Sequence, residues 1–427
     1  MHQKLVSCFL IFNLCFTAWI FAQNSNKENS PYSRYGLGEE RYGFNSALKA
    51  MGGISIAYSN TFAINTNNPA SYAAVKLTTY EVGLEARKRA IASNTESYST
   101  GTFTLSHLTL AFPVGKHGGF VMGLSPKSST YYRFIDSVTI PGVGKSNKTI
   151  NGDGGLSYAF MGGAYQYKNI SLGANLGYEF GMIRHSSYLA NYDTFKVYSS
   201  DFTRTYQIGG LHLKLGALYN WKINKQYTLH LGATYEASQK LNYNEEQYAS
   251  SFRYSGASAI RDTIYAITNA DLPIQLPSSL GLGLQLIAND KLGIGIDYVN
   301  RNFNQYRFNG QADTNVLGNA TRLSVGSYYT PDANDVYHYT QRITYRVGFY
   351  TGKEPLRINN TDITYTAFTF GASLPFKKST DRIHTAVEIG SRGTKSNNLL
   401  VIPLIADKTI TTLVLSLICS NFCKIML

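Results

Sequence analysis

The chain has 427 residues, 15% of them charged and 13% aromatic, and a formal net charge of +13. Its Lys and Arg residues are scattered rather than gathered in runs, which argues against a nucleic-acid surface and favours contact with anionic lipid head groups. The four cysteines lie at residues 8, 15, 419 and 423, so no disulfide framework holds the fold.

Residues 1–22 predict a secretory signal peptide. Lys4 gives a basic start, residues 6–21 are mostly apolar, and Ala22 is a small residue suited to cleavage. A transmembrane anchor is the alternative, but the apolar run is short and contains Asn13 and Thr17. The chain is therefore expected to be exported.

The next segment, residues 23–75, predicts a hatch or plug rather than a wall strand. It is rich in glycine and irregular in pattern, with a short helix expected over residues 45–51. A disordered tail is the alternative. The apolar side chains of Leu48, Met51 and Ile54 argue against disorder because they need burial.

Near its end, this segment contains the stretch NTNNPASYA, residues 65–73, which predicts a rigid turn. Pro69 fixes its own φ and biases Asn68 to an extended form, while Asn67 and Ala70 flank them. We expect this turn to be a hinge that holds the hatch at a set depth. A plain connector is the alternative.

From residue 76 onward the sequence alternates apolar and polar residues with a period of two, as in Leu292, Ile294, Ile296 and Tyr298. This pattern predicts strands with one apolar and one polar face. The runs are long, and aromatic residues cluster near their ends. About fourteen strands are expected, over residues 76–92, 100–114, 118–134, 154–167, 169–184, 204–221, 226–240, 277–288, 291–302, 321–330, 337–351, 363–376, 382–393 and within 409–420.

The connections between these strands alternate between short turns and longer loops, the longest expected over residues 241–276. Short turns at one end and long loops at the other are typical of outer-membrane barrels. A closed barrel also leaves no backbone group unpaired in lipid. We therefore predict an all-β protein, a transmembrane antiparallel barrel over residues 76–427 in the outer membrane of a Gram-negative bacterium.

Catalytic and metal-binding patterns are not found. Gly144-Lys145-Ser146 lacks the earlier glycine of a phosphate-binding loop, and no nucleophile elbow or HExxH pattern occurs. His107, His212 and His230 fall on strands and are interpreted as ordinary polar residues, and Cys419 and Cys423 have no companion ligands. No enzyme activity, metal or cofactor is expected.

The chain resembles the FadL/TodX family of outer-membrane hydrocarbon transporters. The resemblance rests on the Asn68-Pro69-Ala70 turn, on the AMGG stretch of residues 50–53, on residues 345–376, and on the strand count. It implies a fourteen-stranded barrel that binds a hydrophobic small molecule, such as a long-chain fatty acid or hydrocarbon. Outer-membrane lipid and lipopolysaccharide would surround it.

The resemblance also implies sideways release of the ligand through a kink in the third strand. That strand contains Gly123, Ser125 and Pro126, and proline interrupts a ladder because it donates no hydrogen bond. We interpret these residues as a lateral gate. A proline at an ordinary strand end is the alternative.

The end of the chain, residues 398–427, departs from the family pattern. It finishes in Leu427 rather than in the aromatic residue that the barrel assembly machinery reads, and its alternation is weak. A shifted reading frame would explain the change. Leu413, Leu415 and Leu417 still allow a substitute closing strand.

Two functions therefore compete. The first is transport of a hydrophobic small molecule through the barrel into the membrane. The second is a non-transporting barrel that carries or anchors secreted proteins, as in type IX secretion. An outer-membrane hydrolase has no motif in its favour.

Overall fold

The structure is a computed structural model that describes residues 29–92, 97–140, 144–190, 198–255, 258–312, 316–358, 361–377, 379–393 and 406–419. The expected signal peptide and, in the atypical tail, residues 398–405 and 420–427 with Cys423 lie outside these residues. Within the described ranges, no helix is long and apolar enough to cross a membrane.

Nineteen strands and five short helices make up the described part of the chain. The helices are η1 Pro31–Arg34, α2 Ser46–Lys49, η2 Pro69–Ala74, η3 Phe303–Gln305 and α3 Tyr339–Arg342. The strands are β1 Glu39–Glu40, β2 Thr79–Ala92, β3 Ser97–Val114, β4 Gly118–Pro126, β5 Ser128–Ile140, β6 Gly144–Tyr167, β7 Ile170–Ala190, β8 Ser199–Lys222, β9 Tyr227–Glu236, β10 Lys240–Ser255, β11 Ser258–Gln275, β12 Ser278–Ala288, β13 Leu292–Asn302, β14 Arg307–Phe308, β15 Ala320–Tyr329, β16 Thr344–Ile358, β17 Thr361–Pro375, β18 Arg382–Arg392 and β19 Ala406–Cys419.

Fourteen of these strands form a closed ring, which confirms the predicted barrel. Setting aside β1, β5, β10, β11 and β14, each strand pairs antiparallel with the next in order. The ring closes because β19 pairs with β2 from Ala406 opposite Ala92 to Cys419 opposite Tyr80. The atypical tail thus supplies the closing strand that Leu413, Leu415 and Leu417 had predicted.

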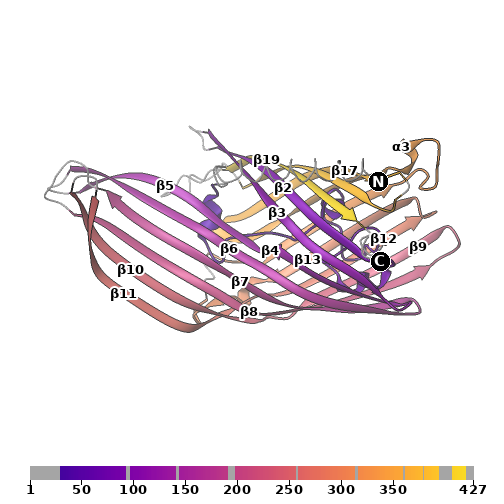
Figure 1. The fold of residues 1–427 in the computed structure, drawn as a ribbon, viewed down its shortest axis with the longest axis horizontal. Coiled ribbons are helices and arrows are strands. Elements are labelled where there is room, and N and C mark those ends of the chain that lie inside the picture. The colour runs from indigo at the N-terminus through magenta and orange to yellow at the C-terminus, as the bar shows by residue number, and fades with distance from the viewer. Residues whose placement is uncertain are drawn as a thin grey trace, which may run out of the picture.

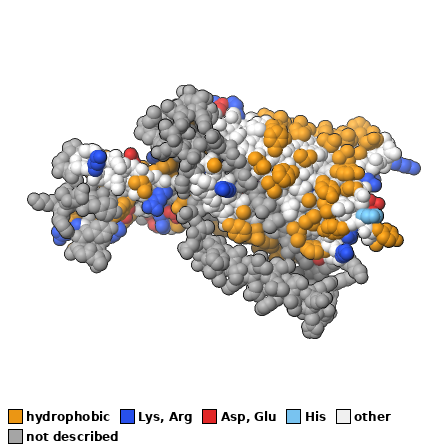
Figure 2. Space-filling model, turned by 90° about the horizontal axis from the view of Figure 1, so that it is seen from above, with side chains coloured by type: hydrophobic (Ala, Val, Ile, Leu, Met, Phe, Trp, Pro, Cys, Tyr) orange, Lys and Arg blue, Asp and Glu red, His pale blue; other side chains and the backbone are white. Residues whose placement is uncertain are grey.

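The barrel is apolar outside and polar inside. On β12, Leu280, Leu282 and Leu284 are exposed, whereas Gln285 is buried on the other face. On the face that Figure 2 shows, hydrophobic side chains are spread over much of the barrel body. Since a soluble protein would bury these side chains, the apolar exterior faces lipid, and the chain is an outer-membrane barrel protein.

Six strands continue beyond this apolar band as a sheet that projects from one end of the barrel (Figure 1). We call it the projecting sheet, and it consists of β5, β10, β11 and the adjoining ends of β6, β7 and β8. The predicted long loop over residues 241–276 is wrong, because these residues form the β10–β11 hairpin. Alternation there is broken by two bulges, at Tyr243/Glu245 and Ala249/Ser250, which concealed the strands from a period-two reading.

Two smaller expectations are also wrong. The stretch of residues 65–73 is only partly a turn, since Pro69 begins the 3₁₀ helix η2 with Asn68 as its N-cap. The strand expected from residue 337 begins at Thr344, because α3 occupies residues 339–342. The helix expected over residues 45–51 is found as α2.

Candidate functional site

Residues 29–75, which we call the hatch segment, are bound to the inside of the barrel wall on several sides. The Asp297 carboxylate on β13 accepts hydrogen bonds from the backbone N–H groups of Ser55 (2.6 Å) and Ile56 (2.8 Å). On β17, the Thr369 hydroxyl accepts from Gly52 N–H at 2.8 Å and donates to the Ala50 carbonyl at 3.1 Å. Backbone groups that the irregular hatch leaves unpaired are thus satisfied by the wall.

The wall also lets the hatch backbone approach unusually closely. Several wall positions that contact the hatch are glycines, and at six of them an added Cβ would come within 2.5 Å of a hatch atom. They are Gly119, Gly173, Gly216, Gly232, Gly326 and Gly348. Glycine is required here by space rather than by φ.

The predicted hatch turn lies within this packed region. Asn68 is fully buried, and its side-chain oxygen accepts from Ala70 N–H at 3.0 Å. Its amide nitrogen donates to the carbonyls of Ile56 (2.6 Å) and Ala217 (3.2 Å). Pro69 and Ala70 are also buried, while Asn67 lines a cavity between the hatch and the wall that reaches Ser125 and Pro126. One asparagine therefore connects two parts of the hatch with β8.

The third wall strand is interrupted at the predicted position. β4 ends at Pro126, and β5 begins at Ser128. β3 pairs with β4 only as far as Leu108 opposite Leu124, and no described pairing joins β3 to β5. The wall therefore opens beside Pro126. Ser125 lines the adjoining cavity, whereas Gly123 still pairs with Thr109 on β3 and lies outside the break.

The first part of the hatch segment fills this opening. Asn29 donates its side-chain amide to the Arg133 carbonyl (3.2 Å) and accepts from Arg133 N–H (3.1 Å), as a neighbouring strand would. Ser30 N–H donates to the Tyr131 carbonyl at 2.9 Å, and Arg41 N–H donates to the Lys127 carbonyl at 2.9 Å. Residues 29–41 thus take the place of the missing neighbour of β5.

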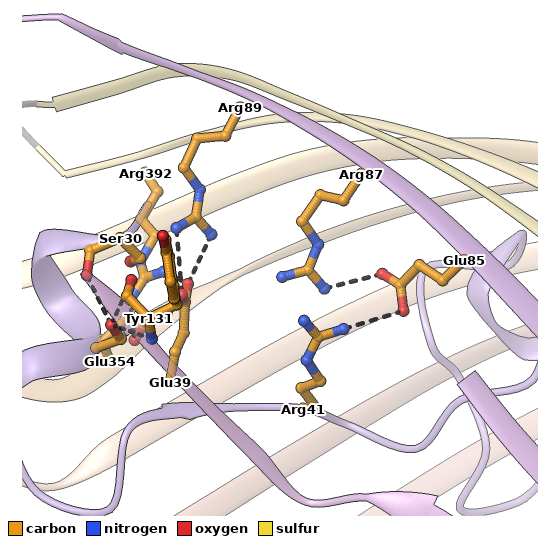
Figure 3. Close-up of polar contacts among 10 residues, drawn as sticks. Ser30, Glu39, Arg41, Glu85, Arg87, Arg89, Tyr131, Glu354 and Arg392 are labelled. Carbon is orange, nitrogen blue, oxygen red and sulfur yellow. Dashed lines mark hydrogen bonds and ion pairs between the residues drawn. The ribbon is translucent and has the colours of Figure 1, made fainter. Parts of the chain in front are cut away.

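Ion pairs connect the same residues to the far side of the opening (Figure 3). Arg89 on β2 binds both oxygens of Glu39, with distances of 2.7 and 3.2 Å. Arg392 on β18 also binds Glu39 and holds Glu354 at 2.9 Å. Since Arg89 is 1% exposed and Arg392 5%, Glu39 provides the negative charge that their burial requires.

A second cluster lies beside the first and is centred on Glu85 of β2, which is 5% exposed. Lys49 and Arg87 each approach one carboxylate oxygen at 2.9 Å, and Arg41 approaches the other at 3.7 Å. Lys49 and Arg41 belong to the hatch segment, so this cluster also joins hatch to wall.

Two of the cavities between the hatch and the wall are neighbours, and they differ in chemistry. One has eleven charged residues among its twenty-two lining residues, including the clusters around Glu39 and Glu85. The other is lined mainly by apolar residues, among them Leu37, Phe303 and Leu356. The pair suits an amphipathic molecule better than a plain hydrocarbon.

The charged clusters were missed from the sequence, although β2 carried a signal. Glu85, Arg87 and Arg89 alternate with Leu84, Ala86 and Lys88, so three charges fall on one face of a strand whose other face is largely apolar. In a membrane barrel such a face points to the lumen. Their partners Glu39 and Arg392 are distant in sequence, so no local pattern reveals the pairing.

The histidines on strands take structural positions. His212 lies between Glu179 (2.7 Å) and Glu236 (3.3 Å), and His107 lies 3.3 Å from Glu81. In the parts of the chain that the structure describes, no group of three or more His, Cys, Asp and Glu residues is arranged to hold a metal ion.

Together, a fourteen-stranded wall, an internal hatch and an interrupted third strand define a FadL-like outer-membrane barrel. Three solved structures share this fold. The Ralstonia pickettii toluene transporter TbuX has a TM-score of 0.60 and 16% identity, covering 88% of this chain and 98% of its own. For the Pseudomonas putida toluene transporter TodX the TM-score is 0.58 and the identity 18%, and the match covers 90% of this chain and 99% of TodX. For a Pseudomonas aeruginosa FadL homologue the TM-score is 0.52 and the identity 14%, and the match covers 88% of this chain and 97% of the homologue.

The sequence gives a more specific assignment. The BamG family model matches residues 1–402, and the chain belongs to the BamG family. No curated protein matches the chain. The identities to the three solved structures are low enough that these establish the fold alone.

Proposed function

We propose that this protein is a non-transporting outer-membrane component that carries or anchors exported polypeptides during barrel assembly. Membership of the BamG family supports the assembly context, with the barrel assembly machinery as a partner.

One observation carries the proposal. The hatch fills the opening beside Pro126 and is joined to the wall on both sides of it, through β5 on one side and through β2 and β18 on the other. A ligand leaving by that opening would have to separate buried ion pairs, which costs several kcal/mol unless each charge finds a new partner. The projecting sheet, in contrast, extends beyond the barrel body (Figure 1), and residues 260–271 of its strand β11 are all exposed.

Depletion of the protein in its host tests this function. The steady-state amounts of other outer-membrane barrels, measured by quantitative proteomics, should fall while inner-membrane proteins remain constant. Restoring the wild-type chain should restore them. Unchanged barrel levels together with reduced growth on fatty acids or aromatic hydrocarbons would contradict the proposal and favour transport.

Transport of a hydrophobic small molecule is the second candidate. The neighbouring pair of cavities favours it, because the charged cavity reaches Pro126 and the other is lined mainly by apolar residues. The ligand would bind with its apolar part near Phe303 and Leu356, and it would enter the bilayer past Pro126. The fold of the two toluene transporters supports this route by analogy.

A double substitution tests the lateral route. Ser125→Thr together with Pro126→Val restores a backbone donor and two strand-forming residues, so it should extend the ladder and close the opening. Uptake should fall while ligand binding to the purified barrel is retained. Unchanged uptake would remove the lateral gate.

A further inference from the structure

We infer that the free edge of β11 in the projecting sheet binds one extended strand of a client polypeptide. The ligand class is a segment of about nine to eleven residues with an uncharged centre and a basic residue towards each end, as a membrane strand provides. The inference rests on the proposed function for the identity of the client. The edge itself is argued from the structure.

The edge is long, and over residues 260–271 it has no described neighbour. β11 pairs with β10 along its length, but on its other side it pairs with β14 only at Ile274 and Gln275. Residues 260–271 are all exposed, so neither face of the strand is covered. Alternate residues of such an edge direct both N–H and C=O groups outward, which is the pattern that another strand satisfies.

The opposite edge of the same sheet shows that the fold covers an edge where it has residues to do so. On β5, Asn29 and Ser30 bind the backbone of Tyr131 and Arg133, at distances of 2.9 to 3.2 Å. Equivalent contacts are not found for residues 260–271 among the described residues. The backbone of the β5 edge is therefore bound by the hatch segment, whereas no described segment binds the β11 edge over residues 260–271.

The side chains of β11 favour strand addition. Ile264 is 63% exposed and Ile267 is 48% exposed. Residues 263–270 carry no charge and no proline, and natural edge strands usually contain such features to prevent pairing. An exposed edge of this kind is a liability unless it is occupied during function.

Charge selects the client strand over a second copy of this chain. Arg261 is bound to Asp201 at 3.1 Å, which leaves the carboxylates of Asp262 and Asp271 at the two ends of the uncharged stretch. Two copies pairing antiparallel along residues 263–270 would place Asp262 opposite Asp271 at both ends. Like charges directly opposite are unfavourable, whereas basic residues on a client strand are attracted.

Proline substitutions at neighbouring positions provide the sharpest test. Ala266→Pro and Ile267→Pro remove adjacent N–H groups, one directed to β10 and the other to the free edge. We call the variant that loses the N–H group on the free edge the outward-proline variant. It should leave the β10–β11 amides protected from hydrogen exchange and should abolish strand binding. The other variant should open the hairpin, so faster exchange of the β10–β11 amides identifies it.

The probe is a synthetic ten-residue peptide of alternating Val and Thr with a lysine at each end, measured by fluorescence anisotropy on the purified full-length barrel. A peptide with glutamate at both ends is the matched control and should bind about tenfold more weakly. Equal binding of the two peptides, or full binding to the outward-proline variant, overturns the inference. Dimers of the wild type that the outward proline dissociates would show a second copy as the occupant and would overturn it too.

This test separates the inference from the proposed function. If the peptide binds at the edge but the outward proline leaves barrel levels in cells unchanged, the binding site stands and the assembly function fails. If depletion lowers barrel levels but the lysine peptide does not bind, the assembly function stands and the edge site fails.

Discussion

Strand β7 passes through both main regions of the molecule. Up to Met182 its large apolar side chains, such as Leu172 and Tyr178, face outward from the barrel body, while Glu179 is buried inside. Beyond Ile183 the strand enters the projecting sheet, where the outer apolar row ends and Arg184 is exposed. One strand thus faces lipid in the barrel body and water in the projecting sheet.

The two regions also differ in what covers their inner surface. In the barrel body, the hatch segment supplies partners for buried carboxylates and for backbone groups, and glycines admit it closely. In the projecting sheet, β11 has a free edge and exposed faces. Substitutions in the body should therefore be costly, whereas those on β11 should affect binding and leave folding intact.

Deletion of residues 31–70 should have the largest effect. It removes the hatch without touching a wall strand, so the barrel should still insert while passive permeability to small polar antibiotics rises. Antibiotic susceptibility of intact cells measures this. Deleting residues 245–269 of the projecting sheet is the control and should leave permeability unchanged. An unchanged susceptibility after hatch deletion would mean that the segment is not a plug.

Glu39→Gln should follow in size. The substitution leaves Arg89 and Arg392 buried without their shared carboxylate, and removal of one partner from a buried ion pair costs about 3 kcal/mol. Denaturant unfolding of the purified barrel measures the loss. Asp362→Asn is the matched control, because its partners Lys353 and Arg357 are largely exposed and the loss should be no more than about 1 kcal/mol. Equal losses would contradict the buried role of Glu39.

Gly119→Ala should cost about 1 to 3 kcal/mol, because the new Cβ would overlap the Tyr72 carbonyl of the hatch. Gly163→Ala on the neighbouring strand β6 is the control, since its Cβ would meet nothing closer than 3.8 Å, and its effect should stay within about 0.5 kcal/mol. Thermal unfolding compares the two. Similar midpoints would show that the hatch yields easily at this point.

The predicted hinge turn should give a smaller and more local effect. Asn68→Gly with Pro69→Gly removes the hydrogen bonds to Ile56 and Ala217 and frees the backbone. Amides of residues 45–66 should exchange faster while wall amides do not. Asn289→Gly, in a turn where the residue has φ +52°, is a control that should change neither. If the double substitution leaves exchange in the hatch unaltered, residues 65–73 are only a connector.

Ile264→Thr on β11 should change stability least, within about 0.5 kcal/mol, because the side chain is 63% exposed and packs against little. Denaturant unfolding checks this value. A loss above 1 kcal/mol would mean that the projecting sheet depends on its edge for folding, and the contrast with the barrel body would disappear.

The sequence by itself determined the wall. Alternation such as that of Leu292, Ile294 and Ile296 requires only that one face meets lipid and the other the lumen, and both conditions act locally on each strand. The fourteen wall strands were predictable for this reason. The interruption at Pro126 was predictable from the resemblance and because proline donates no ladder hydrogen bond.

Only the tertiary structure decided how the interior is held and where the sheet continues. Glu39 meets Arg392 across more than three hundred residues of chain, and a charge carries no local sign of its distant partner. The β10–β11 hairpin was read as a loop, because its bulges break the period of two and its exposed strand lacks an apolar face. Regular alternation along a strand is readable in sequence, whereas contacts between residues far apart in the chain, and strands whose alternation is broken by bulges, are not.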